Sequence, residues 1–140
     1  DMIPLYAQQH DYSAFNVLAV DDVPLNLILV QKMLSRFNFK IRTAANGQLA
    51  LDAVAEQKPD LILLDLMMPG IDGFEVIRRL RENPDTADIR IVILSALNSN
   101  EDVVKGFNMG ADDFIMKPII MEKLLTCVVT QLQIVSAKGK

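Results

Sequence analysis

The sequence predicts an α/β fold of three layers, in which helices cover both faces of a doubly wound, five-stranded parallel sheet. Short apolar runs alternate with stretches of helical periodicity between residues 16 and 135, a pattern typical of βαβ units. The run 61–64 is continuously apolar, which indicates a central strand covered on both faces. With 140 residues, 51% of them apolar, the chain can form one domain with a sizeable core.

Strands and helices are expected in strict alternation. The strands are predicted at 16–20, 40–44, 61–64, 91–94 and 113–116. The helices are predicted at 24–37, from after Gly47 to 57, and at 74–82, 100–109 and 121–135.

Proline and glycine set the limits of the first two helices. Pro24 suits a first helical turn, because the N–H that proline lacks would be unpaired there. Asn46-Gly47 breaks the chain between the second strand and the second helix. Lys58-Pro59 ends that helix ahead of the central strand.

Turn residues also separate the later elements. Pro69-Gly70 and Asp72-Gly73 form a loop after the central strand, and the second pair is expected to supply turn and capping contacts. Gly110 follows the fourth helix and is the expected C-cap.

Residues 1–14 are expected to be a flexible leader or linker, residues 15–136 the folded domain, and residues 137–140 a polar tail.

Cys127 is the single cysteine; it excludes an internal disulfide, suits a reducing, cytoplasmic compartment, and is expected in the core. No apolar run approaches the roughly 20 residues of a membrane-spanning helix. The net charge of −4, without a basic run, argues against nucleic-acid binding.

Side chains suited to phosphoryl chemistry follow four of the predicted strands. Asp21-Asp22, Asp65, Ser95 and Lys117 each stand at or just after a strand end. The carboxyl ends of parallel strands share one edge, where open α/β sheets bind ligands. Asp21-Asp22 alone would also suit a helix N-cap, but the other three side chains at the same edge favour a shared pocket.

Three crowded carboxylates raise at least one pKa by mutual repulsion, and a hard divalent cation with oxygen ligands relieves that repulsion. A carboxylate is also a nucleophile, and Asp65 ends the central strand. The Lys117 ammonium can approach phosphoryl oxygens as a compact charge, and the Ser95 hydroxyl can donate a hydrogen bond. The sequence therefore predicts a Mg²⁺ site with an aspartyl phosphate.

The stretches VDDVPLN, LDLMMPGIDGFE, ILSA and GADDFIMKP occur in this order along the chain. With them, the region from about residue 15 to 135 resembles the receiver domain of two-component response regulators and hybrid histidine kinases. The resemblance implies a flavodoxin-like strand order, 2-1-3-4-5. It also implies that residues 15–136 form a phosphoacceptor switch, which catalyses only its own phosphorylation and dephosphorylation.

The resemblance assigns a role to each residue of the metal site. Asp65 is the phosphoacceptor and a Mg²⁺ ligand. Asp22 is a direct ligand, and Asp21 acts on the metal mainly through water. The backbone carbonyl of Met67 completes the protein's ligands.

The resemblance also implies a switch. Lys117 and Ser95 contact the phosphoryl oxygens, and the bond from Lys117 to Pro118 is expected to be cis. On phosphorylation Ser95 moves toward the phosphoryl group, and Phe114 turns inward. Phe114 stands where tyrosine is commoner, and Ser95 where threonine is, so details of the switch differ here.

Two partner surfaces are expected from the family. The helix at 24–37 carries more apolar residues than a single core-facing stripe needs. Either the helix is buried on several sides, or its outer side is a docking surface. In the second case it would bind the helix that carries the donor histidine of a histidine kinase or a histidine phosphotransfer protein. The last two helices and the strand 113–116 between them could form a face for a downstream protein or a second copy. The residues Leu124, Leu125, Val128, Val129, Leu132 and Val135 make the helix 121–135 similarly broad. No membrane partner is expected.

Met67 and Leu97 stand two residues after Asp65 and Ser95. In the family these positions flank the path of the hydrolytic water, and apolar side chains cannot position it. We therefore predict slow self-dephosphorylation.

Three other functions fit parts of the sequence, but each is disfavoured by one feature of the predicted site. A phosphatase of the haloacid dehalogenase type needs an aspartate where Met67 stands. A flavodoxin-like electron carrier needs a phosphate-binding first loop, where Asp21-Asp22 would repel phosphate. An interaction module blind to phosphate would not need the acidic site. The chain is expected to be a single-domain regulator or, with more support, a piece of a longer protein such as a hybrid kinase.

Overall fold

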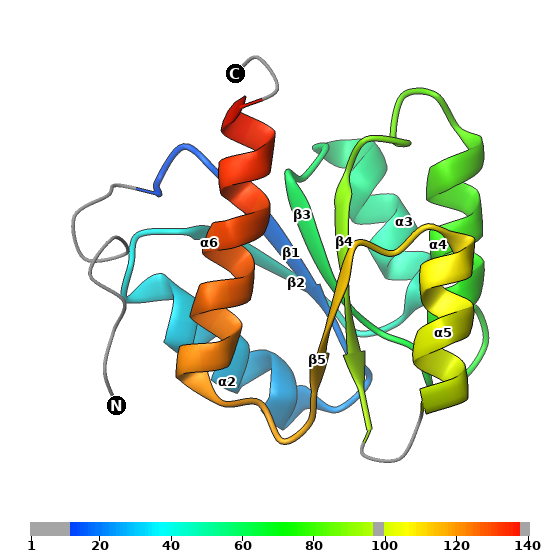
Figure 1. The fold of residues 1–140 in the computed structure, drawn as a ribbon, viewed down its shortest axis with the longest axis horizontal. Helices are drawn as coiled ribbons and strands as arrows, with labels where there is room; N and C mark the ends of the chain where they lie inside the picture. The colour runs from blue at the N-terminus through cyan, green and yellow to red at the C-terminus, as the bar shows by residue number, and fades with distance from the viewer. Residues whose placement is uncertain (1–11, 97–99, 138–140) are drawn as a thin grey trace.

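The computed structural model describes residues 12–96 and 100–137. Within them, strands and helices alternate along the chain (Figure 1). The strands are β1 (Asn16–Val20), β2 (Lys40–Ala44), β3 (Leu61–Asp65), β4 (Arg90–Ser95) and β5 (Asp113–Met116). The helices are α2 (Pro24–Ser35), α3 (Gly47–Glu56), α4 (Gly73–Glu82), α5 (Asn100–Met109) and α6 (Met121–Ala137).

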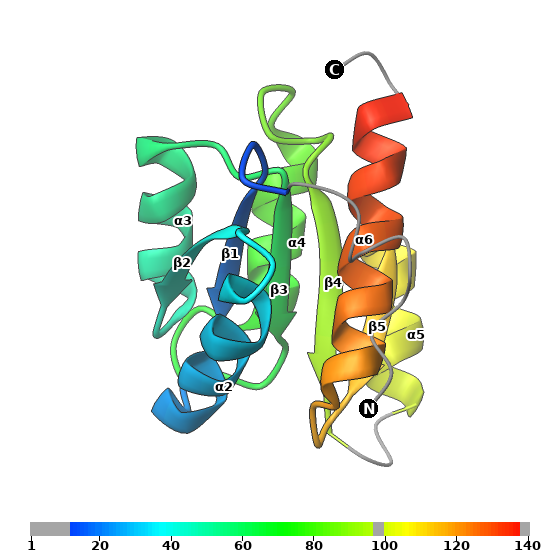
Figure 2. The same ribbon diagram turned by 90° about the vertical axis from the view of Figure 1, so that its left-hand side faces the viewer.

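The five strands form one parallel sheet in the order β2-β1-β3-β4-β5. This confirms the predicted fold class and strand order. Figure 2 shows the strands side by side, with β2 at one edge and β5 at the other.

Helix α2 ends two residues earlier than predicted. The chain leaves the helix through turns in which Phe37 donates to the Leu34 carbonyl and Asn38 to that of Ser35. Asn38 then adopts a φ of 67°, in the left-handed region that asparagine tolerates better than most residues. The strand β2 starts soon after this turn.

Alternate strand residues face opposite layers of helices, and so the core has two halves (Figure 1). One half packs against α2 and α6 and takes from the strands Val17, Ala19, Leu61, Leu63, Val92, Leu94 and Ile115. The other half lies under α3, α4 and α5 and takes Leu18, Val20, Ile62, Leu64, Ile91 and Ile93. Cys127 packs half-buried against the first half.

The carboxyl end of β3 is fixed by the start of α4. Gly73 donates its backbone N–H to the Leu66 carbonyl over 3.0 Å, and a Cβ at this glycine would lie 2.5 Å from the carbonyl oxygen of Asp65. Asp72 caps the helix by accepting from the Glu75 N–H, which confirms the predicted capping role. This close packing holds the backbone of Asp65 in place.

Among residues 12–96 and 100–137, no helix combines the length and apolar character needed to cross a bilayer.

Candidate functional site

The carboxyl edge of the sheet brings together the side chains that the strand ends predicted. Asp21 follows β1, Asp65 ends β3, Ser95 ends β4 and Lys117 follows β5. Asp65, Ser95 and Lys117 line a cavity of about 270 Å³, together with Asp22. Its lining comprises Asp22, Val23, Asp65, Leu66, Met67, Leu94, Ser95, Ala96, Asp102 and Lys117.

Lys117 joins two carboxylates from different strands. Its Nζ lies 3.0 Å from Oδ2 of Asp21 and 3.4 Å from Oδ1 of Asp65. Asp21 is 1% exposed and Asp65 is 5% exposed. The Lys117–Pro118 peptide bond is cis. Buried carboxylates need such a partner, because an unpaired charge away from water is costly.

Asp21 is held by its own loop and by α2. Its Oδ1 accepts the Val23 N–H over 2.9 Å, and its Oδ2 accepts from the Asn26 side-chain amide over 3.0 Å. Val23 is the N-cap residue of α2, so the alternative in which Asp21-Asp22 forms the N-cap is wrong. The role of Asn26 was not predicted from the sequence; its position in the first turn of α2, five residues after Asp21, is the signal that points to this contact.

Carboxylate oxygens of Asp21, Asp22 and Asp65 lie within 4.8 Å of one another, and Asp22 is exposed to solvent. Burial raises the pKa of Asp65 to about 6; Lys117 opposes that rise and Asp21 adds to it. Burial lowers the pKa of Lys117, but contacts with Asp21 and Asp65 outweigh it, so that pKa stands above its ordinary value. The three carboxylates supply converging oxygen ligands, and a bound cation would offset the cost of ionising Asp65. Both features fit a hard divalent cation.

Ser95 is buried at the end of β4, and its Oγ has no hydrogen-bond partner within the described part of the chain. A buried hydroxyl without a partner is uncommon and calls for an explanation. Met67 donates its backbone N–H to Oδ1 of Asp65 over 3.4 Å, while its side chain is 65% exposed. Leu97, named with Met67 in the hydrolysis prediction, lies outside the described residues.

Phe114 points away from the core and is 40% exposed. Its ring meets that of Phe107 on α5 edge to face, with centroids 6.0 Å apart and planes at 89°. The two aromatic rings therefore lie together on the surface formed by α5 and β5.

The two expected partner surfaces differ in exposure. On α2, Leu25, Ile28 and Leu29 are exposed, so broad burial of this helix is wrong. On α6, the residues expected to extend a docking face are core residues instead: Leu124, Leu125, Val128, Val129 and Leu132 are buried, and Val135 is half-buried. The buried ones pack in the same half of the core as Val92 and Leu94 of β4 and Ile115 of β5.

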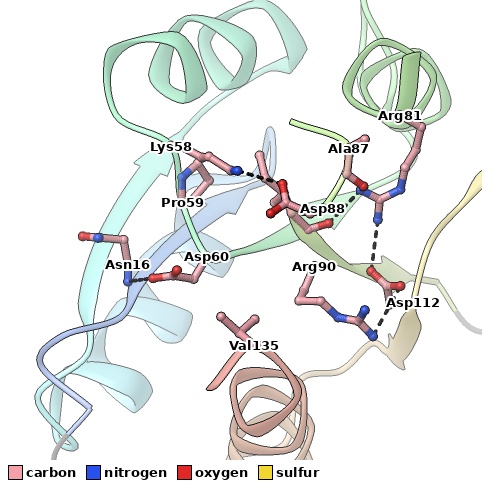
Figure 3. A pocket seen from close by; sticks show the side chains of 11 residues that line it. Asn16, Lys58, Pro59, Asp60, Arg81, Ala87, Asp88, Arg90, Asp112 and Val135 are labelled. Carbon is pink, nitrogen blue, oxygen red and sulfur yellow. Dashed lines mark hydrogen bonds and ion pairs between the residues drawn. The ribbon is translucent and has the colours of Figure 1, made fainter. Parts of the chain in front are cut away.

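A larger cavity, of about 490 Å³, lies at the amino ends of the strands, where Asn16 begins β1 and Arg90 begins β4 (Figure 3). Its charged groups pair with one another: Arg81 and Arg90 contact Asp112, and Lys58 contacts Asp88. Arg81 also donates to the carbonyls of Gly110, Ala87 and Ile89. These contacts join loops and strand starts, so we assign the network a structural role and place the candidate site at the smaller cavity.

The sheet order and the acidic pocket define a flavodoxin-like α/β domain with three clustered carboxylates at the carboxyl edge of its sheet. The family model of the response regulator receiver domain matches residues 17–129. The chain therefore belongs to the response regulator receiver domain family. Receiver domains are phosphoacceptor signalling modules of two-component systems and bind Mg²⁺ at an acidic pocket.

Similarity to individual proteins agrees with this assignment. Response regulator PleD of Caulobacter vibrioides is 43% identical over 103 residues, which cover 74% of this chain and 23% of PleD. A probable cyclic di-GMP phosphodiesterase of Vibrio cholerae is 35% identical over 128 residues, covering 91% of this chain and 29% of that protein. The chain thus spans less than a third of the length of these two relatives.

Solved structures show the same fold. A putative response regulator from Chloroflexus aurantiacus superimposes with a TM-score of 0.82 at 30% identity, over 85% of this chain and 98% of that one. The signal receiver domain of a histidine kinase from Syntrophus aciditrophicus gives 0.79 at 32% identity, over 85% and 90%.

Proposed function

We propose that the domain is a phosphorylation-operated switch, which takes a phosphoryl group from a phosphohistidine partner onto Asp65 in a Mg²⁺-dependent reaction. The observation that carries the proposal is the contact of Lys117 with Asp65 and Asp21 at the carboxyl edge, beside a buried Ser95 hydroxyl without a partner in the described chain. A phosphoryl group on Asp65 would give both the ammonium and the hydroxyl a ligand.

Mg²⁺ would be held by Asp22 and Asp65 directly, by the backbone carbonyl of Met67, and by Asp21 through water. Support comes from the convergence of the three carboxylates and from the raised pKa of Asp65. When bound, Mg²⁺ neutralises the charge that gathers between the acidic pocket and the phosphoryl group.

In the transfer, an oxygen of Asp65 attacks the phosphorus. The new O–P bond forms as the N–P bond to the donor histidine breaks, and that electron pair returns to the imidazole. Lys117 and Ser95 contact the phosphoryl oxygens, so the domain contributes mainly positioning and charge neutralisation. Apart from its own phosphorylation and dephosphorylation, the domain catalyses nothing.

The change to the active conformation follows from new contacts between the phosphoryl group on Asp65 and the side chains around it. Ser95 moves toward the phosphoryl group, Phe114 turns from its exposed position into the space that is left, and the active conformation gains population. The unpartnered Ser95 hydroxyl and the outward ring of Phe114 support this direction of change.

The exposed apolar residues of α2 are the proposed contact for the helix of a histidine kinase or a histidine phosphotransfer protein. The face of α5, β5 and α6 is the proposed contact for a downstream protein or a second copy, with Val104, Phe107, Phe114 and Met116 as its exposed apolar part. We propose a cytoplasmic domain of residues 15–136, with Tyr12 of the preceding segment packed in its core. The proposal includes a leader or linker before the domain, a tail after it, and no nucleic-acid or membrane partners.

Beryllofluoride, which mimics a phosphoryl group on aspartate, tests this function. The amide NMR signals of Ser95 and Phe114 are expected to shift on titration with beryllofluoride plus Mg²⁺. Without Mg²⁺, or in Asp65→Ala, no saturable shift is expected. A wild-type spectrum that stays unchanged at saturating beryllofluoride and Mg²⁺ would contradict the proposal.

A further inference from the structure

The cavity beside Asp65 has few polar side chains. Asp22 and Asp65 serve the metal in the proposed function, while Ser95 and Lys117 serve the phosphoryl oxygens. The apolar remainder of the lining comprises Val23, Leu66, Met67, Leu94 and Ala96. The one lining side chain that stays polar and unassigned, within the described chain, is Asp102.

Asp102 lies in the first turn of α5 and is half-buried. Its carboxylate has no hydrogen-bond or ion-pair partner among the residues that the structure describes. A carboxylate that faces a shared cavity without a partner is free to accept a proton or to hold a water molecule.

A group that accepts a proton can accelerate hydrolysis of an aspartyl phosphate. Water must attack the phosphorus on the side opposite the Asp65 oxygen, because the entering and leaving oxygens lie roughly in line. Asp65 ends β3 and lines the cavity, so the cavity is the open space from which water can reach the phosphorus. The exposed Met67 side chain offers this water only a weakly accepting thioether sulfur and no group that can take its proton.

We propose that Asp102 is the general base that positions and deprotonates the hydrolytic water, an inference that rests on the proposed function. The water oxygen forms a bond to phosphorus, and the O–P bond to Asp65 breaks, with its electron pair returning to the Asp65 carboxylate. The proton of the water passes to the Asp102 carboxylate and then to solvent. The products are inorganic phosphate and free Asp65.

Asp102 could also act structurally, because an acidic residue in the first turn of a helix interacts favourably with the helix dipole. A matched control variant separates this structural role from the proposed one. Glu101 stands in the same turn of α5 but does not line the cavity. Glu101→Gln removes the same charge from the same turn and leaves the cavity unchanged.

The experiment follows the phosphorylated protein by intact mass after the phosphodonor is removed. General bases contribute about 10²–10⁴-fold to such reactions, and we expect Asp102→Asn to slow the decay by about 10- to 100-fold. Glu101→Gln is expected to decay like the wild type, and Asp102→Glu to recover part of the rate. Beryllofluoride affinity and the thermal midpoint, which do not depend on hydrolysis, are expected to change little in Asp102→Asn.

Decay of phosphorylated Asp102→Asn at the wild-type rate, or faster, would overturn the role of Asp102 and leave the proposed function standing. Equal slowing in Glu101→Gln would overturn it too, since the effect would then come from charge at the helix start. A wild type that never gains a phosphoryl group would overturn the proposed function, and this inference with it.

Discussion

Lys117 lies between Asp21 and Asp65, with its ammonium 3.0 Å from the first carboxylate and 3.4 Å from the second. The contact links the end of β5 to the ends of β1 and β3, which are not its neighbours in the sheet. In the unphosphorylated domain the lysine offsets part of the buried negative charge. In the proposed reaction the same ammonium is already next to the carboxylate that becomes phosphorylated.

Replacement of Lys117 by methionine is therefore expected to lower the rate of phosphorylation at Asp65 by about 100-fold, the effect typical of losing a charged contact to a reacting group. Intact mass against time, with a small phosphodonor and Mg²⁺, measures the rate. Lys123→Met is the control, because Lys123 is exposed on α6 and does not line the cavity. Equal rates in the Lys117 variant and the wild type would contradict the assigned role.

The Asp65 carboxylate is expected to destabilise the metal-free domain at neutral pH. Burial raises its pKa from 3.8 to about 6, so between these values the folded state holds more protons than the unfolded state. The free energy of unfolding therefore falls as the pH rises through this window. Asp65→Asn removes the cost and is expected to stabilise the metal-free domain at pH 7.5 by on the order of 1–3 kcal/mol.

Urea unfolding with chelator at pH 7.5 and at pH 4 measures this difference. The gain of Asp65→Asn is expected to shrink toward zero at pH 4, where the wild-type carboxyl is largely protonated when folded. Added Mg²⁺ is expected to stabilise the wild type more than the variant. A variant less stable than the wild type at pH 7.5 would show that the contact with Lys117 outweighs burial.

Phe107 is expected to hold Phe114 outward. An edge-to-face aromatic pair contributes about 0.5–1.5 kcal/mol, and this pair is lost when Phe114 turns inward. Phe107→Ala is thus expected to raise the beryllofluoride affinity by about 2- to 10-fold, because the inward state gains population before binding.

The control for this change is Val104→Ala, which removes another exposed apolar side chain from α5. Isothermal titration with Mg²⁺ present gives both affinities. An unchanged affinity in Phe107→Ala would mean that the ring pair does not bias the switch.

Slow self-dephosphorylation remains a prediction from the sequence. Met67→Asn combined with Leu97→Glu introduces side chains that can hydrogen-bond the hydrolytic water. The double variant is expected to lose its phosphoryl group about tenfold faster than the wild type, as a lower-end effect of a positioned polar group. If its decay rate equals that of the wild type, these two positions do not limit hydrolysis.

Most of the fold could be predicted because local signals agreed with the sheet. Apolar runs such as 61–64 gave the strands, and turn residues gave most helix limits. The end of α2 could not be predicted, because it depends on the left-handed conformation of Asn38 rather than on periodicity. The shared edge of the parallel strands similarly brought Asp21, Asp65, Ser95 and Lys117 together as expected.

The sequence could not predict which apolar residues of the two broad helices, α2 and α6, would be buried. Helices α2 and α6 carry similar apolar residues, yet Leu25 and Ile28 are exposed while Leu125 and Val129 are buried. Periodicity gives the width of an apolar surface but not how much of it the sheet and its neighbours cover. Asp102 was missed for a related reason, since only the packing of α5 beside β4 brings it to the cavity.

The phosphorylation of Asp65 itself is tested most directly by intact mass after incubation with acetyl phosphate, with and without Mg²⁺, on the wild type and on Asp65→Ala. We expect a gain of one phosphoryl group that requires Mg²⁺ and is absent from the variant. A gain of the same mass in Asp65→Ala, or no gain by the wild type with acetyl phosphate and with a phosphohistidine donor alike, would contradict it.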